Sequence, residues 1–280
     1  MIKHELNQGF DWKNREGPFR LISDEQAQQY NESGFLVFED VFDADTIERL
    51  TEELDPIEQK LEELIDEHFG GRMFITRTGE ITFTPHVVTR SPKAKELTQA
   101  QFFRDLVHDL LGDDVRLYWD QTVYKKPGTV DLFPWHQDNG YTYVDPQQYL
   151  TCWVALTDAD EENGCPVVLP GYHREGTWAH ERTELGLDCG VDATGLDTIA
   201  APVRAGGVVV FSSLTPHKTG PNTTKDRPRK AYVVQFAPDG AHVITTEGGK
   251  TERTRCDAPE RQYPILVGGA PPPPGDEGAA

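Results

Sequence analysis

The segment FPWHQDNG, residues 133–140, carries the strongest structural signal in this chain. On an extended strand, residues two apart point to the same side, so His136 and Asp138 can bind one ion while Gln137 points elsewhere. A second histidine, His217, lies much later, in SSLTPHKTGPN, residues 212–222. Two imidazoles and one carboxylate can occupy one face of an octahedral Fe(II) ion and leave the opposite positions open. This interpretation needs a fold that brings a second strand, carrying His217, beside the first.

Four blocks of sequence resemble the phytanoyl-CoA dioxygenase family of iron- and 2-oxoglutarate-dependent oxygenases. They read, in the family's order, YNESGFLVFEDVF (30–42), WHQD (135–138), ENGCPVVLPGYHR (162–174) and HKTGPNTTKDRPR (217–229). Together they span roughly residues 25–240. The resemblance implies a metal site made of His136, Asp138 and His217, with Fe(II), the co-substrate 2-oxoglutarate and O2. It also implies a mainly β fold with buttressing helices, a distorted double-stranded β-helix that is also described as a cupin-like jelly roll.

The resemblance also implies residues that bind 2-oxoglutarate. The family uses an arginine after the second histidine, directly following a proline, and a guanidinium can pair with a carboxylate through two hydrogen bonds. Arg229 fits this description, and Arg227 is the alternative. Strand alternation favours Arg229, because the strand that runs to Phe236 begins there. The other co-substrate contacts implied by the resemblance are Gln121, Gln137, Trp153 and Thr219.

The implied reaction is hydroxylation of a small-molecule substrate, with release of succinate and CO2. Related halogenases replace the ligand carboxylate by a small residue, so the presence of Asp138 predicts hydroxylation and not halide transfer. Lys126 is a further candidate for the pocket, and His173 is expected to fix a turn. The residues that flank the metal motif could line a substrate cavity or pack in the core, and they are Trp135, Asn139, Tyr141 and Tyr143.

Three alternatives stay open at this point. The same three ligands could bind zinc in a hydrolase or isomerase. A non-catalytic jelly roll could bind a metal or a small ligand without turnover. The protein could also be an oxygenase that modifies other proteins, in which case an open groove is expected in place of a deep cavity.

Composition limits the class of protein, its compartment and its partners. The 280 residues include 37% hydrophobic and 26% charged residues, which is typical of a soluble globular protein. The sequence has no apolar run near the ~20 residues that span a bilayer and no secretory signal, and its four cysteines do not suggest a disulfide framework. We therefore expect a cytoplasmic protein. The net charge of −20 argues against partners that are polyanions, so neither nucleic acid nor a membrane surface is expected, and it leans weakly against a coenzyme A thioester. Nothing in the sequence predicts an oligomeric state.

Along the chain we expect one domain, residues 23–262, between an N-terminal arm (1–22) and a disordered tail rich in proline and glycine (263–280). Asp24 is expected to cap a first helix that runs to about Tyr30, and Asp43 or Asp45 to cap a long amphipathic helix. The other expected elements are a strand at 35–38, a helix at 95–111, and β-rich runs at 115–125, 132–137, 149–157, 166–169, 207–212 and 230–237. Residues 174–200 have little periodicity and are expected to form a long loop that could act as a lid.

Overall fold

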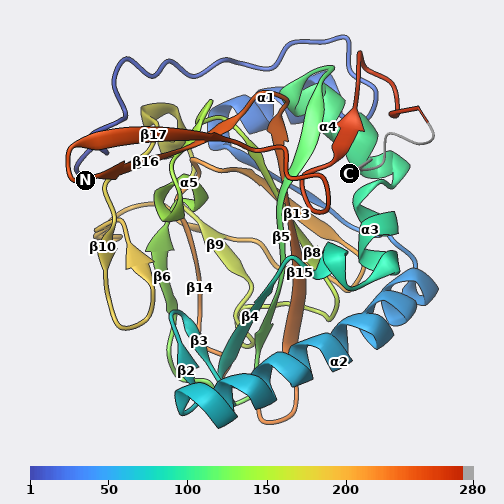
Figure 1. Ribbon diagram of the computed structural model, residues 1–280, viewed down its shortest axis with the longest axis vertical. Coiled ribbons are helices and arrows are strands. Elements are labelled where there is room, and N and C mark those ends of the chain that lie inside the picture. The colour runs from blue at the N-terminus through green and yellow to red at the C-terminus, as the bar shows by residue number, and fades with distance from the viewer. Residues whose placement is uncertain (274–280) are drawn as a thin grey trace.

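The structure is a computed structural model and describes residues 1–273. Its centre is a pair of antiparallel sheets that face each other (Figure 1). The large sheet consists of β1 (Phe35–Phe38), β2 (Arg72–Met73), β3 (Thr76–Arg77), β4 (Ile81–Pro85), β5 (Val115–Lys125), β8 (Leu150–Ala155), β13 (Val208–Ser212), β15 (Arg229–Pro238) and β18 (Pro264–Leu266). Their order is β1-β13-β8-β15-β5-β4-β3-β2, and β18 pairs with β5. The predicted double-stranded β-helix is confirmed.

The small sheet carries both histidines of the predicted metal site. Its strands, in the order β12-β9-β14-β6, are β12 (Ile199–Ala200), β9 (Pro166–Val168), β14 (His217–Thr219) and β6 (Phe133–His136). Two smaller sheets complete the β structure of residues 1–273. One consists of β7 (Val144–Asp145), β16 (His242–Glu247) and β17 (Lys250–Arg255), and the other of β10 (Glu181–Arg182) and β11 (Leu187–Asp188).

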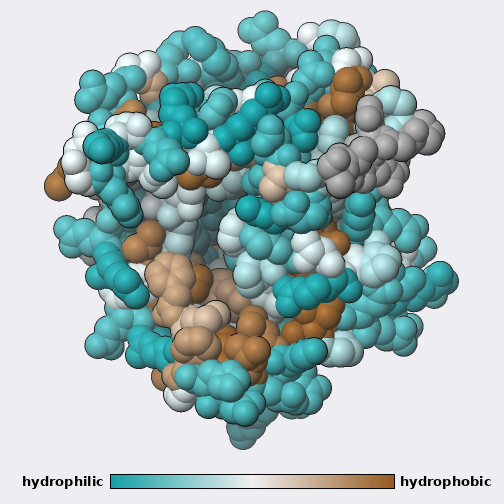
Figure 2. Space-filling model, viewed as in Figure 1, coloured by the Kyte–Doolittle hydropathy of each residue, from teal (hydrophilic) through white to brown (hydrophobic). Residues whose placement is uncertain are grey.

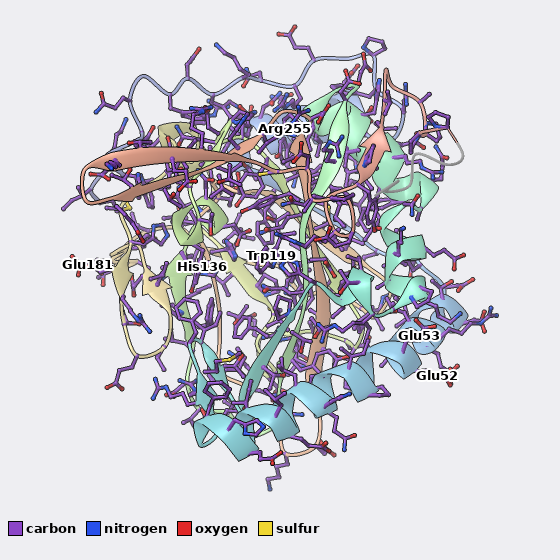
Figure 3. The ribbon with its side chains drawn as sticks, in the orientation of Figure 1. Glu52, Glu53, Trp119, His136, Glu181 and Arg255 are labelled. Carbon is purple, nitrogen blue, oxygen red and sulfur yellow. The ribbon has the colours of Figure 1, made fainter. Side chains whose placement is uncertain are left out.

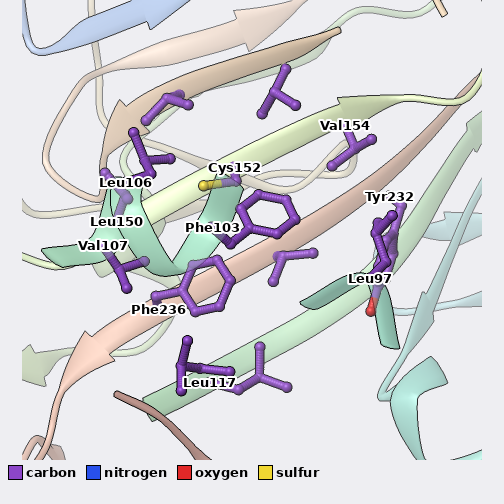
Figure 4. Packing of buried hydrophobic residues seen from close by; sticks show 14 of the residues in the cluster. Leu97, Phe103, Leu106, Val107, Leu117, Leu150, Cys152, Val154, Tyr232 and Phe236 are labelled. Atoms are coloured by element: carbon purple, nitrogen blue, oxygen red, sulfur yellow. The ribbon is translucent and has the colours of Figure 1, made fainter. Parts of the chain in front are cut away.

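The helices cover the face of the large sheet that points away from the small sheet. They are α1 (Asp24–Ser33), α2 (Ala44–Phe69), α3 (Pro92–Thr98) and α4 (Gln101–Leu111), and the short α5 (Asp138–Tyr141) follows β6. Phe103 and Leu106 of α4 pack against Phe236 and Leu150 of the sheet, and all four are completely buried (Figure 4). Burial of each such side chain stabilises the fold by about 1.5–3 kcal/mol. No helix within residues 1–273 has the length and apolarity needed to cross a membrane.

Strand alternation divides the large sheet into two faces. On β8, Cys152 and Val154 belong to the core under the helices, whereas Trp153 belongs to the core between the two sheets. On β15, Val234 faces the helices and Val233 faces the small sheet. Because residues i and i+2 of a strand share a face, the odd-numbered positions of β8 and β15 point into the space between the sheets. This alternation decides which polar side chains reach the site.

Several predicted boundaries are wrong. Ser23, and not Asp24, caps α1, because its hydroxyl accepts the backbone N–H of Gln26 in a capping box. Of the two caps expected for the long helix, Asp43 and Asp45, it is Asp43 that caps α2. The single helix predicted at 95–111 is two helices, since the chain turns at Gln99 and Ala100 between α3 and α4.

The predicted tail begins too early. Tyr263, Ile265 and Leu266 are buried, and residues 264–266 form β18 at the edge of β5, so the packed structure continues beyond residue 262. Residues 274–280 of the predicted tail lie outside the described part of the chain. The predicted loop 174–200 contains β10, β11 and β12, which are two-residue strands too short to give a periodic signal.

The N-terminal arm packs on the domain. The backbone of Lys3 pairs with that of Trp178 in an isolated antiparallel β-bridge. The side-chain amide of Asn7 donates to the carbonyl oxygens of Glu175 and Thr177 at 3.0 and 2.9 Å. The arm therefore covers the segment that follows residue 174.

Candidate active site

The structure brings the three predicted metal ligands together. His136 is the last residue of β6 and His217 is the first of β14, and antiparallel pairing sets them directly opposite each other. Their ring centroids are 4.1 Å apart. Asp138 begins α5, and its Oδ1 lies 3.8 Å from Nε2 of both histidines. One ligand atom from each residue lies within 4.8 Å of the others, near the middle of the molecule, where Figure 3 labels His136.

Both imidazoles are held in one orientation by the backbone. Nδ1 of His136 donates to the carbonyl oxygen of Pro134 at 2.8 Å, and Nδ1 of His217 donates to that of Thr215 at 3.0 Å. A carbonyl oxygen can only accept, so the proton is on Nδ1 and the Nε2 lone pair is free. Burial lowers the pKa of His136 to about 3 and that of His217 to about 4, so both rings are neutral at neutral pH. Two neutral imidazoles and one carboxylate fit the donor set of a facial-triad Fe(II) site.

Gln137 lies between the ligands but does not reach the site. Its backbone is extended, so its side chain points away from the two ligands beside it. The buried amide donates to the carbonyl oxygens of Gly176 and Leu214 at 3.0 and 2.7 Å and accepts the backbone N–H of Trp178 at 2.6 Å. The structure therefore does not place Gln137 where it can touch 2-oxoglutarate, and the amide instead holds the following loop against the metal-binding turn.

Arg229 is a fully buried cation that faces the space between the sheets. Nη1 donates to the carbonyl oxygen of Val123 at 3.3 Å, and the guanidinium lies 5.4 Å from the ring centre of Trp153. Nε and Nη2 are buried and have no hydrogen-bond partner among the described residues. Burial lowers the pKa of Arg229 to about 10, so the group keeps its charge at neutral pH. A buried guanidinium with two unused donors fits a carboxylate group of a ligand.

Arg227 lies at the surface. It forms ion pairs with Asp160 and Glu162, both at 2.6 Å. It precedes β15 and lies outside the cavity described below. The geometry therefore favours Arg229 over Arg227 as the anchor for 2-oxoglutarate.

Lys125 is a buried residue beside the site, and it was not predicted from the sequence. It lies opposite Arg229 in the pairing of β5 with β15, and its Nζ donates to the carbonyl oxygen of Gly220 at 2.5 Å and to Oγ1 of Thr219 at 3.3 Å. Burial, together with the charge of Arg229, lowers the pKa of Lys125 to about 6.

Lys126, predicted from the sequence as a candidate for the pocket, points to the other side of the sheet. Its Nζ pairs with Glu58 at 3.2 Å and Glu62 at 3.1 Å, and both carboxylates belong to α2. The signal that could have found Lys125 is strand alternation, because Lys125 has the same parity as Gln121 on β5.

The triad and Arg229 open into one cavity of about 360 Å³. Of the predicted co-substrate residues, Gln121, Trp153 and Thr219 line this cavity with them. The rest of the wall is largely apolar and aromatic, and it includes Met73, Phe74, Ile75, Phe83, Tyr118, Trp119, Phe133, Tyr141, Tyr149, Phe211 and Val233. Figure 2 shows the face of the molecule hollowed near its centre, with hydrophobic side chains gathered below the hollow, where Figure 1 draws β2, β3 and β4.

Only some residues near the metal motif reach the cavity. Tyr141 lines it, whereas Trp135 packs in a separate apolar cluster and Asn139 donates to Oγ1 of Thr177. The hydroxyl of Tyr143 donates to the carbonyl oxygen of Leu6 in the N-terminal arm.

His180 also contacts the metal-binding turn. Nδ1 of His180 donates to the carbonyl oxygen of Trp178, and Nε2 accepts the backbone N–H of Gln137 at 2.9 Å. The sequence offered no signal for this contact, because His180 lies far from residue 137 along the chain. His173 is buried against Gly34, where an added Cβ would lie 2.6 Å from its Nδ1, which agrees with the structural role expected for it.

The fold and the ligand set define a non-haem metal oxygenase built on a double-stranded β-helix. A family model described as phytanoyl-CoA dioxygenase (PhyH) matches residues 30–231. The chain belongs to this family, and it is an Fe(II)- and 2-oxoglutarate-dependent oxygenase that uses O2.

Individual relatives are distant. The chain is 25% identical over 231 residues to a probable alpha-ketoglutarate-dependent hypophosphite dioxygenase of Stutzerimonas stutzeri, covering 77% of this chain and 79% of the relative. It is 25% identical over 258 residues to the peroxisomal phytanoyl-CoA dioxygenase of Bos taurus, covering 83% and 73%. It is 25% identical over 218 residues to a methylphosphonate hydroxylase of Gimesia maris, covering 77% and 81%.

Solved structures share the fold. The carbocyclase SnoK from nogalamycin biosynthesis has a TM-score of 0.65 at 22% identity, covering 80% of this chain and 87% of SnoK. EctD from S. alaskensis with 2-oxoglutarate and 5-hydroxyectoine has a TM-score of 0.64 at 22% identity, covering 86% and 84%.

Proposed function

We propose that this oxygenase hydroxylates a small molecule whose reacting part is uncharged, with 2-oxoglutarate anchored by Arg229. The observation that carries the proposal is the buried guanidinium of Arg229, which shares one cavity with the triad and has two unused donors. A cation held away from water without a carboxylate partner is costly, and an anionic ligand offsets that cost.

Each of the cavity residues makes a different contact with 2-oxoglutarate. Arg229 pairs with the carboxylate that is distant from the metal, and the hydroxyl of Thr219 is available beside it. The indole N–H of Trp119 donates to Oε1 of Gln121 at 3.2 Å, so the NH2 group of Gln121 is the end left to donate to the co-substrate. Trp153 packs against the guanidinium and excludes water from the pair.

Bound Fe(II), with 2-oxoglutarate and O2, supplies the oxidant that converts a C–H bond to C–OH, and 2-oxoglutarate leaves as succinate and CO2. His136 and His217 present neutral Nε2 atoms to the metal, and Asp138 supplies one negative charge. Because Asp138 fills the third protein position, that position is not open to a halide, which supports hydroxylation over halogenation.

The wall of the cavity supports an uncharged reacting group. Among the described residues that line it, Arg229 is the one arginine or lysine. If Arg229 holds 2-oxoglutarate, no second guanidinium or ammonium lines the described part of the cavity to bind a phosphonate or carboxylate of the substrate. Relatives are named for hypophosphite and methylphosphonate, and we infer that this chain takes a different class of substrate, an apolar or aromatic small molecule or the apolar end of a longer one. A cavity of about 360 Å³ shared with 2-oxoglutarate also favours a small molecule over a protein loop.

The proposal is tested by incubating the Fe(II)-loaded protein with 2-oxoglutarate, 18O2 and a panel of uncharged aromatic and alicyclic compounds. Succinate is expected to form faster with a substrate present, and the product is expected to gain one 18O atom. The matched panel carries the same skeletons with a phosphonate or carboxylate next to the reacting carbon, and it is expected to give no stimulation. A product that has lost two hydrogens, closed a ring or gained a halogen would overturn hydroxylation. Stimulation by the anionic panel alone would overturn the substrate class.

A further inference from the structure

The two oxygens of the ligand carboxylate have different partners. Oδ1 of Asp138 faces Nε2 of both histidines at 3.8 Å, whereas Oδ2 accepts the hydroxyl of Thr151 at 2.5 Å. The side chain of Asp138 is largely buried, and Thr151 is almost completely buried. A carboxylate oxygen that already accepts a short hydrogen bond is a poorer metal ligand than its free neighbour. The contact with Thr151 therefore distinguishes Oδ1, as the atom that can bind the ion, from Oδ2.

The Asp138 carboxylate fixes the direction of the Thr151 hydroxyl, and the hydroxyl in turn orients a third residue, Gln235. Nε2 of Gln235 donates to Oγ1 of Thr151 at 3.2 Å. A hydroxyl has one proton, and an ionised carboxylate can only accept, so the proton of Thr151 must point to Asp138. Gln235 must then present its NH2 group to Thr151, because an amide oxygen in that position would find no proton.

The sheet itself builds this chain of hydrogen bonds. Thr151 on β8 and Gln235 on β15 are direct partners in the antiparallel register, and both line the cavity. Their odd-numbered positions put them on the same face as Trp153 and Arg229. Asp138 approaches from the small sheet, so the contact joins the two sheets at the metal site.

We propose that Thr151 and Gln235 are positioning residues that hold Asp138 as a ligand through one oxygen. A carboxylate that turns to bind through both oxygens takes an additional coordination position. Holding Oδ2 on Thr151 keeps that position open for 2-oxoglutarate or O2. The inference deepens the proposed function, but its first part, the effect on the metal site, does not depend on the identity of the substrate.

The first measurement is Fe(II) affinity without oxygen, by competition with a chromogenic chelator, for wild type and variants. Thr151→Val keeps the shape of the side chain and removes the hydroxyl, and it is expected to weaken Fe(II) binding by about 10- to 100-fold, as is common for partners of metal ligands. Thr151→Ser keeps the hydroxyl and is expected to restore most of the affinity. Gln235→Leu is expected to show a smaller loss. If Gln235 acts through Thr151, the double variant binds Fe(II) like Thr151→Val alone.

The matched control is Thr122→Val. Thr122 lies on β5, is buried, and its hydroxyl has no partner among the described residues. The same change of chemistry there is expected to leave Fe(II) affinity unchanged, which separates loss of the hydrogen bond from a general disturbance of the sheet. Circular dichroism and thermal unfolding of the metal-free variants check that each is folded.

The second measurement reads coordination directly. Visible d–d absorption of the Co(II)-substituted protein depends on coordination number, and it is expected to change in Thr151→Val but not in Thr151→Ser. Wild-type affinity and spectrum in a folded Thr151→Val variant would overturn the proposal. So would a raised KM for substrate with unchanged Fe(II) binding, because Thr151 would then be a substrate contact. Loss of Fe(II) affinity in Thr151→Val supports the positioning role even if the wild-type protein produces no succinate, an outcome that would refute only the proposed function.

Discussion

Arg229→Met is expected to weaken binding of 2-oxoglutarate strongly while leaving the metal-free protein at least as stable as wild type. Methionine has a similar length and no charge, so it fills the space beside Trp153 without the unused donors. The structure therefore predicts opposite effects on ligand binding and on folding.

The expected change in the free energy of unfolding follows from the burial of the Arg229 charge. Burial lowers the pKa of Arg229 from 12.5 to about 10, and at about 1.4 kcal/mol per pKa unit the buried charge costs about 3 kcal/mol at neutral pH. The variant also loses the hydrogen bond to Val123 and the contact with Trp153, at about 1 kcal/mol each. The free energy of unfolding of the metal-free variant is therefore expected to equal that of wild type or to exceed it by about 1 kcal/mol.

The expected effect of Arg229→Met on 2-oxoglutarate binding is larger than its effect on folding. Removing one member of a buried, hydrogen-bonded charge pair costs about 2–5 kcal/mol, which weakens binding of 2-oxoglutarate by about 30-fold to several thousand-fold. Ligand at 100 times its Kd stabilises the wild-type protein by about 2.7 kcal/mol, or roughly 5–10 °C in Tm. At the same ligand concentration the variant is expected to gain at most about 0.9 kcal/mol, or roughly 2–3 °C in Tm, because the ligand is then no more than about 3 times the variant's Kd.

The assay is thermal and urea unfolding with Mn(II) as a redox-inactive metal, with and without 2-oxoglutarate, supported by calorimetric titration. Arg227→Met is the matched control, because Arg227 pairs with Asp160 and Glu162 at the surface and should keep the ligand-induced shift. The reasoning is refuted if Arg229→Met retains the shift, or if Arg227→Met loses it while Arg229→Met does not. A metal-free Arg229→Met protein several kcal/mol less stable than wild type would refute the cost assigned to the buried charge.

Three further changes test other parts of the site. Gln137→Leu is expected to lower the free energy of unfolding by about 2–4 kcal/mol, because it leaves the Trp178 N–H and two carbonyl oxygens unpaired; urea unfolding measures this, and unchanged stability would contradict it. Burial lowers the pKa of His173 to about 4, so the neutral ring carries no penalty above its ordinary pKa of 6.5, and the free energy of unfolding falls as the pH drops from 6.5 toward 4. His173→Gln should remove about 3 kcal/mol of this fall in the metal-free protein. Parallel curves of unfolding free energy against pH for wild type and variant would count against this. A methyl group at Gly140 would lie 2.0 Å from Cε1 of His180, so Gly140→Ala should displace the metal-binding turn and weaken Fe(II) binding, and wild-type affinity in the chelator assay would show that the turn tolerates it.

Local patterns in the sequence predicted much of the fold. Short β-branched runs such as VVVF at 208–211 predicted β13, and a carboxylate cap at Asp43 or Asp45 predicted the start of α2. Such signals depend on neighbouring residues, and so they can be read without knowing the tertiary contacts. β18 was missed because residues 264–266 become a strand only by pairing with β5, more than a hundred residues earlier.

The residues of the site also fall into those predicted from the sequence and those that only the tertiary structure places. The sequence by itself determined which residues could bind the metal, because His136 and Asp138 are two residues apart and His217 lies in a motif that resembles the family. The tertiary structure decided which of the neighbouring residues face the space between the two sheets. Lys125 and not Lys126, and Arg229 and not Arg227, face the space between the sheets, and Gln137 faces away from it. For Lys125 and Gln137 the physical reason is that each strand has two faces, and only the packing of the second sheet decides which face encloses the site. For Arg227 the reason is that β15 begins at Arg229, so Arg227 lies outside the sheet.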